Sequence, residues 1–95
     1  MMTSRKPFLS TQDLLVTLLT QCRKEAGLTQ VQLAQRLGVG QSMVSKVERG
    51  ILRLDLVGLR SWLRGIGKPT LVDFVRSFDE QASAGDRALG SWRPK

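Results

Sequence analysis

Apolar positions along the chain recur with the period of an α-helix, and glycine separates one run from the next. The first run follows Ser10 and Thr11, either of which can cap a helix, and it stops before Gly27. Its stripe consists of Leu14, Leu15, Leu18, Leu19 and Cys22. No run keeps the two-residue alternation of a half-buried strand. The pattern therefore predicts an all-α chain.

A short helix is predicted over residues 30–37. Thr29 and Gln32 have the spacing of a capping box, in which each side chain bonds to a backbone amide near the other. Gly38 is placed to end this helix, because glycine readily adopts the left-handed conformation found there. The residues expected to face inward are Leu33, Ala34 and Leu37.

A second short helix is predicted after Gly40 and ends at about Arg49, with Gly50 closing it. Val44 and Val47 should face inward. At under three turns this helix is too short to be stable alone in water. We expect it to depend on packing against the rest of the domain.

The last two helices are predicted after Asp55 and Thr70, both good capping residues. The inward positions of the fourth are Leu56, Leu59, Leu63 and Ile66, and those of the fifth are Leu71, Phe74, Val75 and Phe78. This pattern gives one folded domain over residues 11–80. Residues 1–10 are expected to be a flexible arm and residues 81–95 a flexible basic tail.

The charge of the chain points to a polyanionic partner. Its 95 residues include 15 Lys and Arg against 8 Asp and Glu, a formal charge of +7. Residues 29–53 have a net charge of +3, whereas residues 54–80 are neutral. Nucleic acid and an anionic membrane surface both fit this balance. A membrane-surface protein would use a basic amphipathic helix, which the neutral fourth and fifth helices do not supply.

Several classes of function are disfavoured by the composition. The chain has no histidine and a single cysteine, Cys22, so the usual zinc ligands and the commonest general base are missing. We therefore expect no metal, no cofactor and no catalytic residue. Gln12 and Asp13 interrupt the apolar run near the amino terminus, and no stretch is long enough to span a membrane. A cytoplasmic location is expected.

The outward face of the second short helix has side chains suited to reading DNA. With Val44 and Val47 turned inward, it exposes Gln41, Ser42, Ser45, Lys46 and Arg49. Glutamine can bond adenine with two hydrogen bonds, lysine can reach guanine, and serine can bond base or phosphate. Any solvated helix also has a polar face. A protein-docking face, however, would be expected to present aromatic or aliphatic anchors.

The run from Leu28 to Gly50 resembles the helix-turn-helix of the phage repressor and Cro family, also called the XRE family. The similarity lies in Thr29 and Gln30 at the first helix start, "LAQRLGV", Gln41 at the second start, and "VSKVERG". It extends less sharply over residues 12–80. The resemblance implies a lambda-repressor-like fold of five short helices, with the helix-turn-helix at the second and third.

The resemblance also implies a role for individual residues. The base-edge readers would be Gln41, Ser42, Ser45 and Lys46. The phosphate contacts would be Gln30, Arg36, Arg49 and Arg53. Arg23 and Glu48 fall where family members have an ion pair that joins the first and third helices. Many relatives have Ser or Thr where this chain has Gly40, so one capping and phosphate contact is expected to be missing.

The function implied is that of a sequence-specific DNA-binding transcriptional regulator, most simply a repressor of an inverted-repeat operator. Such proteins bind double-stranded DNA as homodimers, since two copies one DNA turn apart multiply the selectivity of one. Residues 56–80, with the fifth helix as the preferred seam, are expected to join the copies. The interface set would be Trp62, Phe74, Val75 and Phe78, although these residues also suit the core.

An antitoxin remains the alternative to a simple repressor. It would be the same DNA-binding dimer, regulating its own operon and binding a toxin protein. The sequence does not separate the two, and it assigns no role to Trp92.

Overall fold

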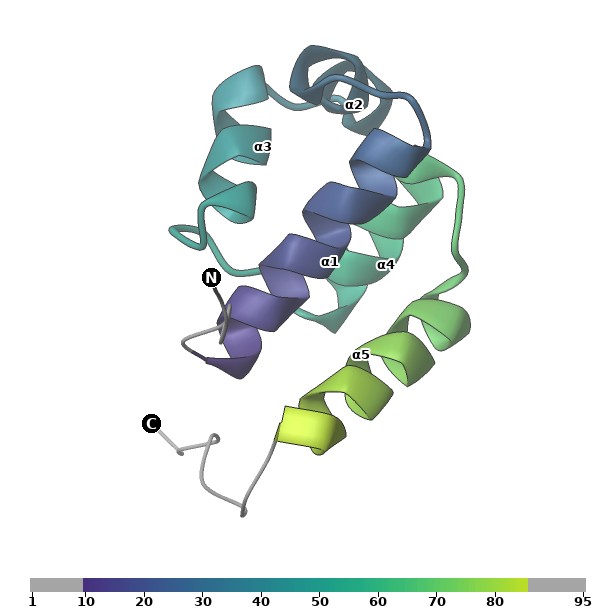
Figure 1. The fold of residues 1–95 in the computed structure, drawn as a ribbon. Helices are drawn as coiled ribbons and strands as arrows, with labels where there is room; N and C mark the ends of the chain where they lie inside the picture. The colour runs from purple at the N-terminus through teal and green to yellow at the C-terminus, as the bar shows by residue number, and fades with distance from the viewer. Residues whose placement is uncertain (1–9, 86–95) are drawn as a thin grey trace, which may run out of the picture.

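The computed structural model describes residues 10–85, which form five helices and contain no strand (Figure 1). The helices are α1 (Thr11–Glu25), α2 (Gln30–Leu37), α3 (Gln41–Glu48), α4 (Leu56–Ile66) and α5 (Leu71–Gly85). This confirms the all-α fold expected from the sequence. Residues 1–9 and 86–95, including Trp92, lie outside the described part.

The helices begin where their capping residues predict. The Ser10 hydroxyl accepts a hydrogen bond from the amide of Asp13 at 3.1 Å. At α2 both halves of the capping box form: the Thr29 hydroxyl accepts from the Gln32 amide at 3.0 Å, and the Thr29 amide donates to Gln32 Oε1 at 2.9 Å. Gly38 ends α2 with φ of +72°, a left-handed value that suits glycine. Local chemistry thus fixes the lengths of these helices.

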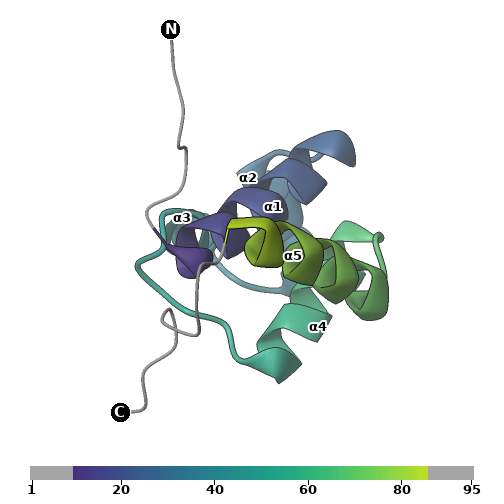
Figure 2. The same cartoon turned by 60° about the horizontal axis from the view of Figure 1, so that its bottom comes forward.

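The core lies between α1, α2, α3 and α4, and α5 adds Phe74 to it. Its largest fully buried side chains come from all four helices and are Leu19, Leu33, Val44, Val47 and Leu63. α1 packs against α3 and against α5, and α2 packs against α3 and α4. Figure 1 shows α3 and α5 on different sides of α1, and α5 lies alongside α1 in both views (Figures 1 and 2). Because Val44 and Val47 are buried in this core, they hold the short α3 in place.

Gly65 allows α2 and α4 to approach closely. A Cβ added at this residue would lie 2.6 Å from Leu37 Cδ2 and 3.2 Å from Leu37 Cγ. A glycine inside a helix costs about 1 kcal/mol relative to alanine. Here that cost is offset because the missing methyl leaves room for Leu37.

The structure corrects several expectations for α4 and α5. Leu56 is 65% exposed and Val75 is 42% exposed, so neither faces inward. Trp62 and Phe74 are only 4% and 2% exposed within one chain, so they belong to the core and offer no surface to a second copy. Since Trp62 joins the buried stripe of α4, the stripe turns away from Leu56, which lies in the first turn.

The carboxy-terminal boundary also differs from the expected one. α5 continues to Gly85, beyond the end at residue 80 that the apolar pattern suggested. Its last turn, residues 82–85, has no large apolar side chain, and just before that turn Gln81 Nε2 donates to Ser77 Oγ at 3.1 Å. Within residues 10–85, no helix combines the length and apolar character needed to cross a membrane.

Candidate nucleic-acid interface

The outer face of α3 presents the polar side chains expected from the sequence. Val44 and Val47 are 0% and 1% exposed and fix the rotation of the helix. As a result Gln41, Ser42, Lys46 and Arg49 are exposed, and Ser45 is half-buried. Arg49 Nε donates to Ser45 Oγ at 3.2 Å, which draws the guanidinium along this face. The face therefore offers donors and acceptors over its whole length.

The amino-terminal ends of α2 and α3 are joined by their first residues. Gln41 Nε2 donates to Gln30 Oε1 at 2.7 Å. Gln30 Nε2 in turn donates to Glu48 Oε1 at 3.0 Å. Gln30 thus bridges the beginning and the end of α3 from the start of α2. The sequence analysis did not predict this hydrogen bond between the two glutamines. The signal that could have suggested it is that each glutamine is the first residue of its helix, and that the two lie eleven residues apart in the chain.

Glu48 also forms a nearly buried ion pair with Arg23. Its Oε2 lies 2.7 Å from Arg23 Nε and its Oε1 lies 3.1 Å from a terminal guanidinium nitrogen of Arg23. The two side chains are 9% and 6% exposed. Arg23 also donates to the carbonyl of Leu28 at 2.7 Å. Arg23 therefore joins α1, the α1–α2 turn and the end of α3.

The hydrogen bond from Gln30 leaves Gln41 able to bind a base. A side-chain amide has two N–H donors and a carbonyl acceptor. Gln41 uses one N–H on Gln30, which leaves one donor and the acceptor. Those two groups are what a bidentate contact with adenine N7 and N6 requires. The bond to Gln30 removes rotamer freedom from an exposed side chain, and less entropy is then lost on binding.

The amino-terminal end of α2 has backbone donors close to this network. The first amides of a helix have no partner inside it. The capping box uses those of Thr29 and Gln32, so the amides of Gln30 and Val31 remain for an outside acceptor. α3 has no equivalent side-chain cap, because its capping position is Gly40.

Arg36 does not lie with the other phosphate candidates. One of its terminal nitrogens donates to the carbonyls of Gly65 and Ile66, at 3.2 and 3.5 Å. These are free carbonyls at the carboxy-terminal end of α4, where a cation is favourable. Figure 1 shows the end of α4 on the opposite side of α1 from α3. The phosphate role that the resemblance implied for Arg36 does not fit this geometry.

We expect Arg36→Ala to lower the free energy of unfolding by about 0.5–1 kcal/mol, because α4 loses the cation at its end. The slope of DNA affinity against salt should be nearly unchanged. Arg53→Ala is the matched comparison, since Arg53 is exposed in the α3–α4 connection. It should leave stability unchanged and flatten the salt slope by about one unit. Chemical denaturation measures the free energy of unfolding, and DNA titrations at several salt concentrations measure the salt slope. If Arg36→Ala flattened the salt slope and left stability unchanged, Arg36 would belong to the DNA interface.

The fold and the polar face define a helix-turn-helix DNA-binding protein. A helix-turn-helix family model matches residues 19–57. An uncharacterized HTH-type transcriptional regulator from Methanothermobacter thermautotrophicus is 35% identical over 57 residues, covering 60% of this chain and 83% of that protein. An XRE-family like protein from Pseudomonas syringae superposes with a TM-score of 0.70 and 37% identity, covering 75% of this chain and 85% of that one. The chain belongs to the XRE family of helix-turn-helix transcriptional regulators.

Proposed function

We propose that this regulator is a repressor that reads an inverted-repeat operator through the major groove with the outer face of α3. The observation that carries the proposal is the exposed Gln41 side chain, held by a hydrogen bond of 2.7 Å to Gln30. Ser42, Ser45 and Lys46 share that face. Such side chains discriminate bases by about 1–3 kcal/mol for each good bidentate pair.

Phosphate contacts on both sides of this face would fix the register on the duplex. On one side are the Gln30 side chain and the free amides of the first turn of α2. On the other are Arg49 and Arg53, which are both exposed. Phosphate contacts position a protein on DNA, while base contacts give the sequence preference.

Selection of bound sequences from a random DNA pool tests the proposal directly. The expected result is an inverted repeat whose half-sites are about one helical turn apart, roughly 34 Å. Enrichment without a shared sequence would indicate binding by charge alone and would contradict recognition through α3.

The dimer that an inverted repeat requires has a candidate surface next to α3. Four exposed apolar side chains lie between the end of α3 and the first turn of α4: Ile51, Leu52, Leu56 and Val57, which are 62%, 38%, 65% and 74% exposed. We call these four the loop patch. A second copy is the proposed occupant, because a seam beside α3 sets the distance between two recognition helices. Of the interface residues expected on α5 and α4 from the sequence, Val75 is exposed and Phe78 is half-buried, so these two could still contact a second copy. Val72, beside them on α5, is also exposed.

We expect Leu56→Ser combined with Val57→Ser to raise the dimer dissociation constant by tenfold or more, on the basis of about 1.5–3 kcal/mol for each buried aliphatic side chain. Affinity for an isolated half-site should stay the same. Val72→Ser combined with Val75→Ser is the matched control on α5. Sedimentation at several concentrations measures both. If only the α5 variant dissociates, the seam lies there instead.

A further inference from the structure

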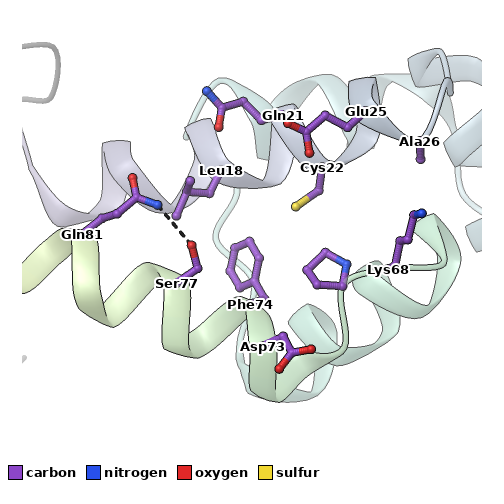
Figure 3. A pocket seen from close by; sticks show the side chains of 11 residues that line it. Leu18, Gln21, Cys22, Glu25, Ala26, Lys68, Asp73, Phe74, Ser77 and Gln81 are labelled. Carbon is purple, nitrogen blue, oxygen red and sulfur yellow. Dashed lines mark hydrogen bonds between the residues drawn. The ribbon is translucent and has the colours of Figure 1, made fainter.

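An apolar groove of about 440 Å³ lies between α1 and α5, on the other side of α1 from α3. Its floor includes Leu18, Cys22 and Phe74, which Figure 3 shows pointing into the space between the two helices. Pro69 also lines the groove, and Figure 3 shows Lys68 and Gln81 toward opposite ends of it. The volume falls in the range that accommodates a large side chain or small ligand.

The rim of the groove is polar and has more acidic than basic groups. Glu25 and Asp73 contribute carboxylates and Lys68 a single amine. Asp73 has an ion pair with Arg76 at 3.8 Å, but both side chains are more than 60% exposed, and such pairs are weak. An occupant with an apolar centre and basic flanks would complement this surface.

We propose that the groove binds residues 86–95 of the same chain, with Trp92 against Leu18, Cys22 and Phe74. This segment, DRALGSWRPK, combines an aromatic residue with three basic residues and one acidic residue. Tryptophan has a large apolar surface to bury. The basic residues Arg93 and Lys95 would meet the carboxylates of Glu25 and Asp73. This inference does not depend on DNA recognition, which uses a different face.

The connection to α5 makes this arrangement feasible. Gly85 follows Gln81, which lines the groove, by four residues. The return distance from Gly85 to the level of Phe74 is about 17 Å at the helical rise. Seven extended residues from Gly85 to Trp92 span up to about 23 Å. Tethering at this length gives an effective concentration in the millimolar range, so a weak contact suffices.

The amino-terminal residues fit the groove less well. Their aromatic residue, Phe8, precedes Ser10 by two residues and can extend only about 7 Å from the start of α1. Leu18 lies about 12 Å along α1 from Ser10. Phe8 could therefore touch the floor of the groove only with its ring fully extended along α1, whereas Trp92 has chain length to spare.

The single cysteine supplies a reporter for the test. Cys22 lines the groove and is half-buried. Its burial, and then the charge of Glu25, raises the pKa of its thiol. Alkylation by iodoacetamide, which is neutral, should therefore be followed at one fixed alkaline pH in the full chain, in Trp92→Ala, and in a chain ending at Gly85. The matched control is Trp92→Phe, which keeps an aromatic side chain.

We expect Trp92→Ala and the shortened chain to be alkylated about three- to tenfold faster than the full chain, as an effective millimolar concentration allows. Trp92→Phe should stay close to the parent. A synthetic peptide of residues 86–95 should restore protection to the shortened chain. Far-UV circular dichroism checks that each variant is folded. The melting temperature should fall slightly when the tail no longer docks, because a contact made only with the folded domain stabilises it.

Three outcomes would overturn the proposal. Equal alkylation of the full and shortened chains would mean that the tail leaves the groove open. Protection that grows with chain concentration would assign the groove to the tail of a second copy. Loss of protection when residues 1–9 are removed, with the tail intact, would assign it to the amino-terminal segment.

Discussion

Replacing Glu48 by alanine is expected to lower the free energy of unfolding by about 3 kcal/mol or more, because it leaves the nearly buried Arg23 without its carboxylate. The substitution removes two hydrogen bonds from Arg23, at 2.7 and 3.1 Å, and one from Gln30 at 3.0 Å. For a domain of this size the melting temperature should fall by roughly 4–8 °C per kcal/mol. Thermal unfolding followed by circular dichroism measures the change.

The exposed pair of Arg76 and Asp73 supplies the matched control. These groups lie 3.8 Å apart with side chains 67% and 62% exposed. Arg76→Ala should change stability by no more than about 0.5 kcal/mol, since water screens such a pair. Glu48→Gln should fall between the two, because it keeps an acceptor for Gln30. If Glu48→Ala had the same melting temperature as Arg76→Ala, the buried pair of Arg23 and Glu48 would have no structural role.

Much of the fold could be predicted from the sequence because it is determined locally. Thr29 and Gln32 need only each other to form a capping box, and Gly38 needs only its own left-handed backbone. Val44 and Val47 could be assigned to the core because a short helix has few apolar residues to bury. These features depend on neighbours within four residues, so the chain itself specifies them.

The errors occur where tertiary packing decides the outcome. Leu56 fits the apolar stripe of α4, yet Trp62 shifts the buried face and leaves Leu56 in solvent. Trp62 and Phe74 suited either a core or a seam by residue type alone. Their burial follows from the packing of α4 and α5 against the other helices, which no local pattern contains.

In the candidate site, too, local features could be predicted from the sequence and tertiary contacts could not. The outward residues of α3 follow from its helical period once the valines are assigned. Arg36, in contrast, is drawn to α4 by carbonyls that lie 29 and 30 residues away. The bond from Gln41 to Gln30 spans eleven residues and depends on the angle between α2 and α3. The family resemblance suggested the roles of these side chains, but only the structure supplies their contacts.

Gln41→Ala is expected to reduce discrimination at one base pair of the operator by about 1–3 kcal/mol, or roughly five- to 150-fold, because the bidentate pair with the base can no longer form. Gln30→Ala should reduce discrimination at the same base pair by a smaller factor. It leaves the Gln41 amide intact but removes the bond that orients it. Affinities for the operator and for variants substituted at each position, measured at one salt concentration, give both factors.

The double variant distinguishes orientation from independent contacts. If Gln30 acts by orienting Gln41, then its removal should have little further effect on discrimination once Gln41 is alanine, and the two losses should be non-additive by about 0.5–1.5 kcal/mol. Gln35→Ala is the matched control, because Gln35 is an exposed glutamine on the same helix as Gln30. It should leave every ratio unchanged. Additive losses from Gln30 and Gln41 would mean that each glutamine contacts DNA on its own, and that the 2.7 Å bond does not prepare the recognition face.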